Sequence, residues 1–169
     1  MKTICLYFEL HQIVHLKRYR FFDIGTDHYY SDDYANEASI SHIAENSYIP
    51  ALNAMIDMAK QSNGYFKVAL SMSGVALELL ERYAPAVIEL LQELSATGCC
   101  EFLAEPYSHG LASLAPNGEE GFREETFRLV EKINQLFGQK PTVFRNSNLI
   151  YNDDIGAMVA GMGFKGVLT

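Results

Sequence analysis

Runs of apolar residues alternate with amphipathic segments along this chain. The apolar runs are nearly continuous and have the length of strands, which is typical of strands buried on both faces of a parallel sheet. In the segments between them, apolar residues recur every three or four positions, the spacing of one helix face. This order predicts an α/β fold with parallel strands. The predicted strands are residues 3–10, 66–73, 99–104, 141–146 and 164–169.

Residues that favour helix ends bound the amphipathic segments. Ser, Asn and Asp cap helix N-termini, Pro is favoured in the first turn, and Gly ends many helices. The predicted helices begin at Ser47, Ser73, Pro85, residue 119, and Asn152 or Asp153, and they end near Gly64, Tyr83, Gly98, Gly138 and Met162.

These assignments leave residues 13–46 as a long loop after the first strand. The loop is rich in aromatic and acidic residues, among them Tyr29 and Tyr30. Long loops with little secondary structure are often lids or binding segments. Aromatic faces that stack on sugar rings are one interpretation. The other is a cluster that packs under its own loop.

Composition and charge narrow the class of protein. The chain has 169 residues, enough for one domain or part of one, and its formal net charge is −8. Its densest basic run is only "LKRYR" at residues 16–20, so nucleic acid is not an expected partner. Glu9 interrupts the apolar N-terminal run before any cleavage site, which predicts a cytoplasmic protein without a signal peptide or membrane span.

Polar side chains follow several predicted strands, and ligand sites of parallel α/β proteins form at the carboxyl ends of strands. Glu101 lies inside the third strand, where a carboxylate needs a partner. We expect either an ion pair with Arg145 or contact with a substrate. His11 and His15 are four residues apart, but no third ligand is evident, so no metal site is predicted. The candidate residues are His11, Gln12, Ser71–Ser73, Glu101, Glu105, His109 and Arg145–Asn148.

Several stretches together resemble glycoside hydrolase family 57, on its α-amylase branch. They are "YFELHQ", "RYRFFDIGTDHYYSDDYANE", "SGVALELLERYAP", "CCEFLAEPYSHGLASL" and "FGQKPTVFRNSNLIYNDDIGAMVAGMGFKGVLT", and they cover nearly the whole chain. The resemblance implies an incomplete seven-stranded (β/α) barrel, retaining hydrolysis or transfer at α-glucosidic bonds, and no catalytic metal or other cofactor. Residues 1–169 would be the N-terminal five βα units of that barrel, truncated after the fifth strand.

The resemblance also exposes two departures from the family. The motif similar to "FRNSNLIY" carries the nucleophile, a Glu, at the position of Asn148, and the acid/base Asp of the family lies on a later strand, beyond Thr169. Ile13 stands where the family has Pro. The resemblance therefore implies a non-catalytic relative that binds an α-glucan or maltooligosaccharide. Its groove would be lined by His11, Glu101, His109, Arg145, Tyr29 and Tyr30.

Two other classes remain open from the sequence. A metal-dependent polysaccharide deacetylase-like enzyme shares the seven-stranded barrel and would use histidines with an Asp. A non-catalytic interaction module would bind neither glucan nor metal.

Overall fold

Parallel strands form the centre of the molecule in the computed structural model, which describes residues 4–169. Strands β1 (Leu6–Leu10), β2 (Val68–Met72) and β3 (Cys100–Leu103) form one sheet in that order. Strands β4 (Val143–Arg145) and β5 (Gly166–Leu168) form a second sheet. The predicted parallel α/β fold is confirmed.

A parallel bridge between Ala104 and Phe144 joins the two sheets just beyond the end of β3. The amide of Ala104 donates to the carbonyl of Val143 at 2.9 Å, and the amide of Arg145 donates to the carbonyl of Ala104 at 2.8 Å. The strands therefore follow one another in space in chain order.

The strand register decides which side chains reach the site. Phe8 pairs with Leu70, which pairs with Phe102, and this row faces the helices. Glu9 pairs with Ser71, which pairs with Leu103. Because successive side chains alternate between faces, this second row lies on the opposite face, away from the helices.

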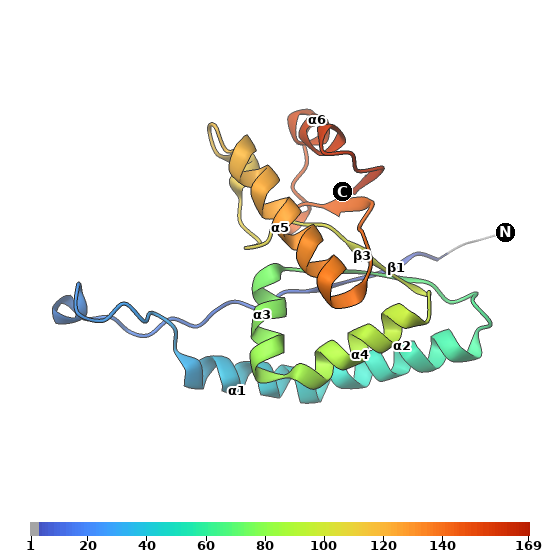
Figure 1. Ribbon diagram of the computed structural model, residues 1–169, viewed down its shortest axis with the longest axis horizontal. Coiled ribbons are helices and arrows are strands. Elements are labelled where there is room, and N and C mark those ends of the chain that lie inside the picture. The colour runs from blue at the N-terminus through green and yellow to red at the C-terminus, as the bar shows by residue number, and fades with distance from the viewer. Residues whose placement is uncertain (1–3) are drawn as a thin grey trace.

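Figure 1 shows how the helices are arranged around the strands. Their buried side chains form two apolar cores. Helices α2 (Ile49–Gln61), α3 (Gly74–Tyr83) and α4 (Pro85–Ala96) share a core with β1–β3, and α6 (Asp153–Gly161) shares the other with β4. Helix α5 (Glu119–Phe137) contributes Leu129 and Ile133 to the first core and Phe122 to the second. Within residues 4–169, no helix is long and apolar enough to cross a membrane.

Several predicted helix ends are confirmed. The side chain of Ser73 accepts a hydrogen bond from the amide of Ala76 and caps α3. The side chain of Asn152 accepts from the amide of Ile155 and caps α6. Gly138 ends α5 in the left-handed region, at φ 67°. A local rule of backbone hydrogen bonding placed the ends marked by Ser73 and Gly138, and the structure decides between Asn152 and Asp153 in favour of Asn152.

The prediction of a loop is wrong for residues 33–46, because they are helical. Helix α1 (Asp33–Ile43) runs through the π-helical segment Ala44–Tyr48 directly into α2. Asp32 is the cap, accepting from the amide of Ala35, and Ser47 caps nothing. Within α1 only Asn36 and Ile40 are buried, so the sequence carries no apolar stripe that would have revealed this helix.

The remaining part of that loop, residues 13–32, forms an arm that extends away from the body (Figure 1). Its two sides are held together by hydrogen bonds from the amide of Lys17 to the carbonyl of Tyr30 at 2.8 Å and from the amide of Asp32 to the carbonyl of His15 at 2.9 Å. At the turn Phe21–Asp23, the side chains of Phe21 and Phe22 are exposed.

Burial on both faces was predicted for every strand, and this is wrong for β1. Leu10 is its one buried residue, whereas Leu6 and Phe8 are exposed. The physical reason is position. Within residues 4–169, β1 pairs with β2 alone, so its other edge carries no strand and its helix-facing row is only half covered.

Candidate functional site

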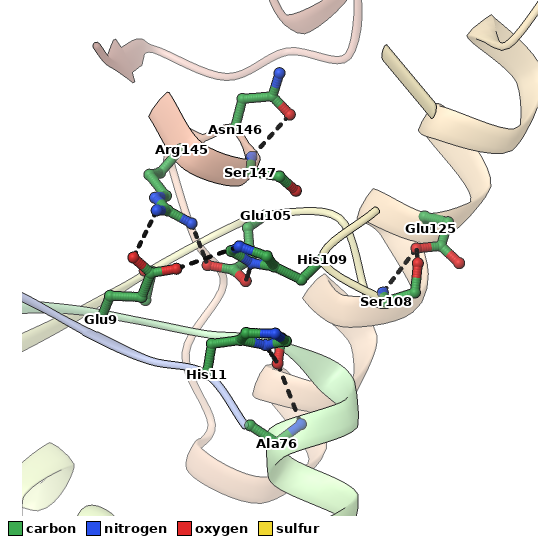
Figure 2. A network of polar contacts seen from close by, with 12 residues as sticks. Glu9, His11, Ala76, Glu105, Ser108, His109, Glu125, Arg145, Asn146 and Ser147 are labelled. Atoms are coloured by element: carbon green, nitrogen blue, oxygen red, sulfur yellow. Dashed lines mark hydrogen bonds and ion pairs between the residues drawn. The ribbon is translucent and has the colours of Figure 1, made fainter. Parts of the chain in front are cut away.

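Four charged or titratable side chains from three strand ends meet in a closed cycle, here named the charged ring (Figure 2). Arg145 at the end of β4 donates through Nη2 to Oε2 of Glu9 on β1 at 2.6 Å. Its Nη1 lies 3.5 Å from Oε2 of Glu105, which follows β3. His109 completes the ring, with Nδ1 3.1 Å from Oε1 of Glu105 and Nε2 3.6 Å from Oε1 of Glu9. Each cationic or potentially cationic group thus faces two carboxylates.

The ring is deeply set. Glu105 is 0% exposed and Arg145 is 3% exposed, while Glu9 is partly open to solvent. Buried charges are tolerated only when they are paired, which the ring achieves. Some polar atoms of the site nevertheless make no hydrogen bond within residues 4–169: Oε2 of Glu105, Nε and Nη1 of Arg145, and Oγ of Ser147. These acceptors and donors are therefore unsatisfied within the described residues, although the atoms themselves are buried.

His11 lies directly against the charged ring (Figure 2). Its imidazole stacks on that of His109 with a centroid separation of 4.1 Å and an interplanar angle of 17°. Its Nδ1 lies 2.8 Å from Oγ of Ser73, the residue that caps α3. Burial, and then the neighbouring His109, lower the pKa of His11 below its ordinary value, which favours the neutral ring.

The sheet face that points away from the helices also carries a pair of hydroxyl groups. Tyr7 on β1 and Ser71 on β2 lie with their hydroxyl oxygens 2.7 Å apart. Burial raises the pKa of Tyr7 above its ordinary value, although its bond with Ser71 acts in the opposite direction. This pair keeps the floor of the site polar and uncharged.

The backbone is strained where the site is built. His109 has φ 55° and Leu149 has φ 56°, in the left-handed region that residues other than Gly, Asn and Asp rarely adopt. Asn148, in the short turn Ser147–Leu149, has φ 53°, a conformation that suits Asn. Such strain clusters at functional sites, because the surrounding structure must hold it in place.

Three residues of the ring could be considered as metal ligands. Glu9, Glu105 and His109 offer ligand atoms that lie within 4.8 Å of one another. However, Arg145 already pairs with both carboxylates, and the two nitrogens of His109 face different carboxylates rather than one shared point. The charges and orientations therefore fit an ion-pair network better than a cation site.

The structure brings several of the predicted site residues together, Glu105 and Ser73 among them, and separates Glu101. His11, His109 and Arg145 belong to one cluster. Glu101 is exposed on β3, and its expected ion pair with Arg145 is wrong, because Arg145 pairs with Glu9 and Glu105. Whether Glu101 contacts a ligand stays a prediction.

The two predicted tyrosines lie on the arm. Tyr29 donates to both carboxylate oxygens of Asp33 at the start of α1 and lies near Arg82 at the end of α3, opposite the end that Ser73 caps. Tyr30 packs on Tyr19. The structure does not bring either tyrosine to the charged ring, so their contact with a sugar remains a prediction. The residues from His11 to His15 are not helical, so they do not present two imidazoles on one helix face.

Sequence reasoning missed Glu9, and it selected Ser73 as a strand-end candidate without foreseeing its contact with His11. Glu9 lies two residues before His11 at the end of the first strand, so the rule that had selected His11 could have selected it. Ser73 was recognised as a cap, but its contact with His11 joins positions 62 residues apart. Only the strand register reveals that contact.

The fold is parallel α/β, and a cluster of charged and polar side chains lies at the carboxyl ends of its strands, where such proteins place ligand sites. The sequence profile of "Glycosyl hydrolase family 57" matches residues 5–169. The chain therefore belongs to glycosyl hydrolase family 57, which confirms the resemblance drawn from its motifs.

Named relatives agree with this assignment. A protein of Methanocaldococcus jannaschii named "Putative alpha-amylase" is 33% identical over 140 residues, which cover 83% of this chain and 29% of that protein. The crystal structure of 4-alpha-glucanotransferase from Thermococcus litoralis matches 78% of this chain and 20% of that chain, with 18% identity and a TM-score of 0.67. The chain thus spans less than a third of the length of either relative.

Carbohydrate esterases share part of the fold. A family 4 carbohydrate esterase from Streptomyces lividans matches 73% of this chain and 56% of that chain, with 18% identity and a TM-score of 0.51. BA3943, a family 4 pseudoenzyme from Bacillus anthracis, matches 73% of this chain and 40% of that chain, with 11% identity and a TM-score of 0.54. At these identities the likeness concerns the fold alone.

Proposed function

We propose that this chain is the first part of an α-amylase-like barrel, and that it binds an α-glucan or maltooligosaccharide at the charged ring without hydrolysing it. The observation that carries this proposal is the cluster of charged and polar side chains at the carboxyl ends of the strands, in which Glu9 is partly open to solvent and several buried atoms lack a partner. Family membership supplies the class of ligand. The short share of each relative that the chain covers supports the idea that further barrel units belong to the complete protein.

The chemistry of the free atoms suits sugar hydroxyls. A hydroxyl both donates and accepts, so it can pair with a carboxylate oxygen as well as with a nitrogen of the site. An anionic ligand would face two carboxylates, and a cation would face the guanidinium. A neutral, hydroxyl-rich ligand satisfies the site without displacing an ion pair.

Asn148 is the reason for proposing binding without catalysis. Retaining glycosidases need two carboxyl groups about 5 to 5.5 Å apart, one of which attacks the sugar. We assign the nucleophile position to Asn148 from its motif, and an amide has no negative charge with which to attack or to stabilise the sugar cation. Its exposed side chain and left-handed backbone suit a ligand-facing position, where the amide would form hydrogen bonds.

A deacetylase-like activity is the alternative to test. It shares the fold, but its metal would need ligands, and in this chain the nearest candidates are engaged by Arg145. Zinc bound stoichiometrically by the purified protein would favour the esterase class, while glucan binding without zinc favours our proposal.

Restoring the carboxylate tests the role of Asn148. In the 169-residue chain, Asn148→Glu should yield no α-glucan hydrolysis, because the family places the acid that protonates the leaving oxygen on a later strand, outside these residues. In a longer form that carries the later Asp of the family, the same change should produce turnover of maltooligosaccharides. A general acid contributes about 10² to 10⁴-fold, so release of reducing sugar should separate the two forms clearly.

Asn148→Gln is the matched control, since it changes side-chain length without adding a carboxylate. It should leave both forms inactive. Hydrolysis by the unaltered 169-residue chain, at rates typical of enzymes and free of contaminating amylase, would show that another residue is the nucleophile and that our assignment of Asn148 is wrong.

A further inference from the structure

Ser73 has two contacts that together define the position of a hydrogen atom. Its Oγ accepts from the amide of Ala76 at 3.1 Å, as the cap of α3. The same Oγ lies 2.8 Å from Nδ1 of His11. Ser73 is 0% exposed, so solvent does not offer the hydroxyl another partner.

A serine hydroxyl has one hydrogen to donate. If Nδ1 of His11 carried a proton and donated to Ser73, the hydroxyl would accept twice and its own hydrogen would have no acceptor among residues 4–169. A buried donor without a partner is unfavourable. With the hydroxyl donating to Nδ1, the amide of Ala76, the hydroxyl of Ser73 and Nδ1 of His11 all have a partner.

We propose that Ser73 is a positioning residue that holds His11 as the tautomer protonated on Nε2, with the Nε2–H group presented to a ligand hydroxyl. The tautomer follows from the contacts of Ser73 alone, while the ligand rests on the proposed function. Nε2 makes no hydrogen bond within the described part of the chain, so its proton is available to a ligand.

Two further features favour a neutral imidazole with a fixed orientation at His11. The stack on His109 sets the plane of the imidazole, at 4.1 Å between centroids. Burial and then the neighbouring His109 lower the pKa of His11, so the ring has a single proton to place over more of the pH range. Glu9, Glu105 and Arg145 also face this pair of rings. Ser73 therefore decides which nitrogen of His11 carries that proton.

Nitrogen-15 NMR of the 169-residue chain tests the tautomer directly. Protonated and unprotonated ring nitrogens of neutral histidine have widely separated chemical shifts, and His11→Gln assigns the signal among the five histidines of the chain. At a pH where the ring is neutral, we expect the protonated shift at Nε2 and the unprotonated shift at Nδ1. The reverse pattern would overturn the proposal.

Substitutions then test the role of Ser73. Ser73→Ala should let His11 populate both tautomers and should weaken maltooligosaccharide binding about twofold, the factor expected when the competent tautomer falls to about half of the population. Ser73→Thr keeps the hydroxyl and should retain the tautomer. Asp32→Ala removes the cap of α1 instead, so it should lower stability comparably without moving the signals of His11.

The outcomes separate the two proposals. An unchanged tautomer in Ser73→Ala overturns the positioning role, whatever binds. If Ser73→Ala does not fold, the tautomer of the unaltered chain decides the question. The expected tautomer in a chain that binds no maltooligosaccharide supports the role of Ser73 and refutes the proposed function.

Discussion

The charges in the charged ring are compensated by one another. Arg145 and Glu105 are almost fully buried, and either alone would be an uncompensated charge in the interior. His11 differs, because it contacts the ring by stacking and carries its own burial cost when protonated. Its titration therefore reports on the site without dismantling it.

The pKa shift of His11 predicts how stability depends on pH. Burial, and then His109, place the pKa of His11 below 6.5 in the folded chain, so the unfolded chain binds this proton more readily. The contribution of His11 to stability is complete above about 6.5 and is lost as the pH falls toward the lower folded value. We expect the free energy of unfolding, measured by chemical denaturation, to decrease as the pH is lowered through this window.

His11→Gln should flatten that dependence, since the titrating group is gone. His28→Gln is the matched control, because His28 is exposed on the arm and its removal should preserve the pH dependence. A His11→Gln chain with the slope of the unaltered protein would contradict this origin of the effect.

Among the helices, α5 connects the two apolar cores. Leu129 is 0% exposed in the core with β1–β3, while Phe122 packs with Phe144 of β4 in the other core. Packing along a single helix therefore transmits the position of one sheet to the other.

Leu129→Ala should lower the free energy of unfolding by about 2 to 5 kcal/mol, the usual range for removing a buried leucine. Glu124→Ala, on the exposed face of the same helix, should change it by less than about 0.5 kcal/mol. Urea denaturation of both variants checks the comparison. Equal effects of the two substitutions would mean that α5 is not fixed by this core.

The sequence predicted elements whose signals are local. Ser73, Asn152 and Gly138 ended helices as expected, because capping depends on residues within one turn. Helix α1 escaped prediction because it buries Asn36, whose side chain bonds to the carbonyl of His15 on the arm rather than to apolar neighbours. A helix fixed by tertiary hydrogen bonds leaves no hydrophobic period to detect.

The site was predictable only as a set of strand ends. The rule for carboxyl ends selected His11, His109 and Arg145, which do meet. It could not choose between Glu101 and Glu105 as the partner of Arg145, because that choice depends on where β3 ends and on which residue reaches β4. The sequence alone determines neither.

Across the chain as a whole, the pair of Glu9 and Arg145 joins its first and fourth strands. The two residues are 136 positions apart, and β1 and β4 are not neighbours in either sheet. The charged ring therefore links these strands by ion pairs on the sheet face that points away from the helices.

A double-mutant cycle with Glu9→Gln and Arg145→Met measures the strength of that link. We expect a coupling energy of about 0.5 to 3 kcal/mol, the range for residues that share one ion-pair network. The exposed pair of Lys60 and Glu93, which links α2 and α4 at 2.7 Å, provides the matched surface pair and should give about 0.2 to 1 kcal/mol. A coupling at the ring no larger than at the surface would show that the ring does not hold the strands together.

Calorimetric titration of the 169-residue chain with a maltooligosaccharide tests the central claim most directly. We predict saturable heat of binding without release of reducing sugar, and an affinity about fivefold lower for His11→Gln, which loses one hydrogen bond to the ligand. Lys60→Ala, remote on α2, should bind as the unaltered chain does. No heat of binding by the unaltered chain at millimolar sugar, or equal affinities for His11→Gln and Lys60→Ala, would contradict the assignment of the charged ring as a glucan site.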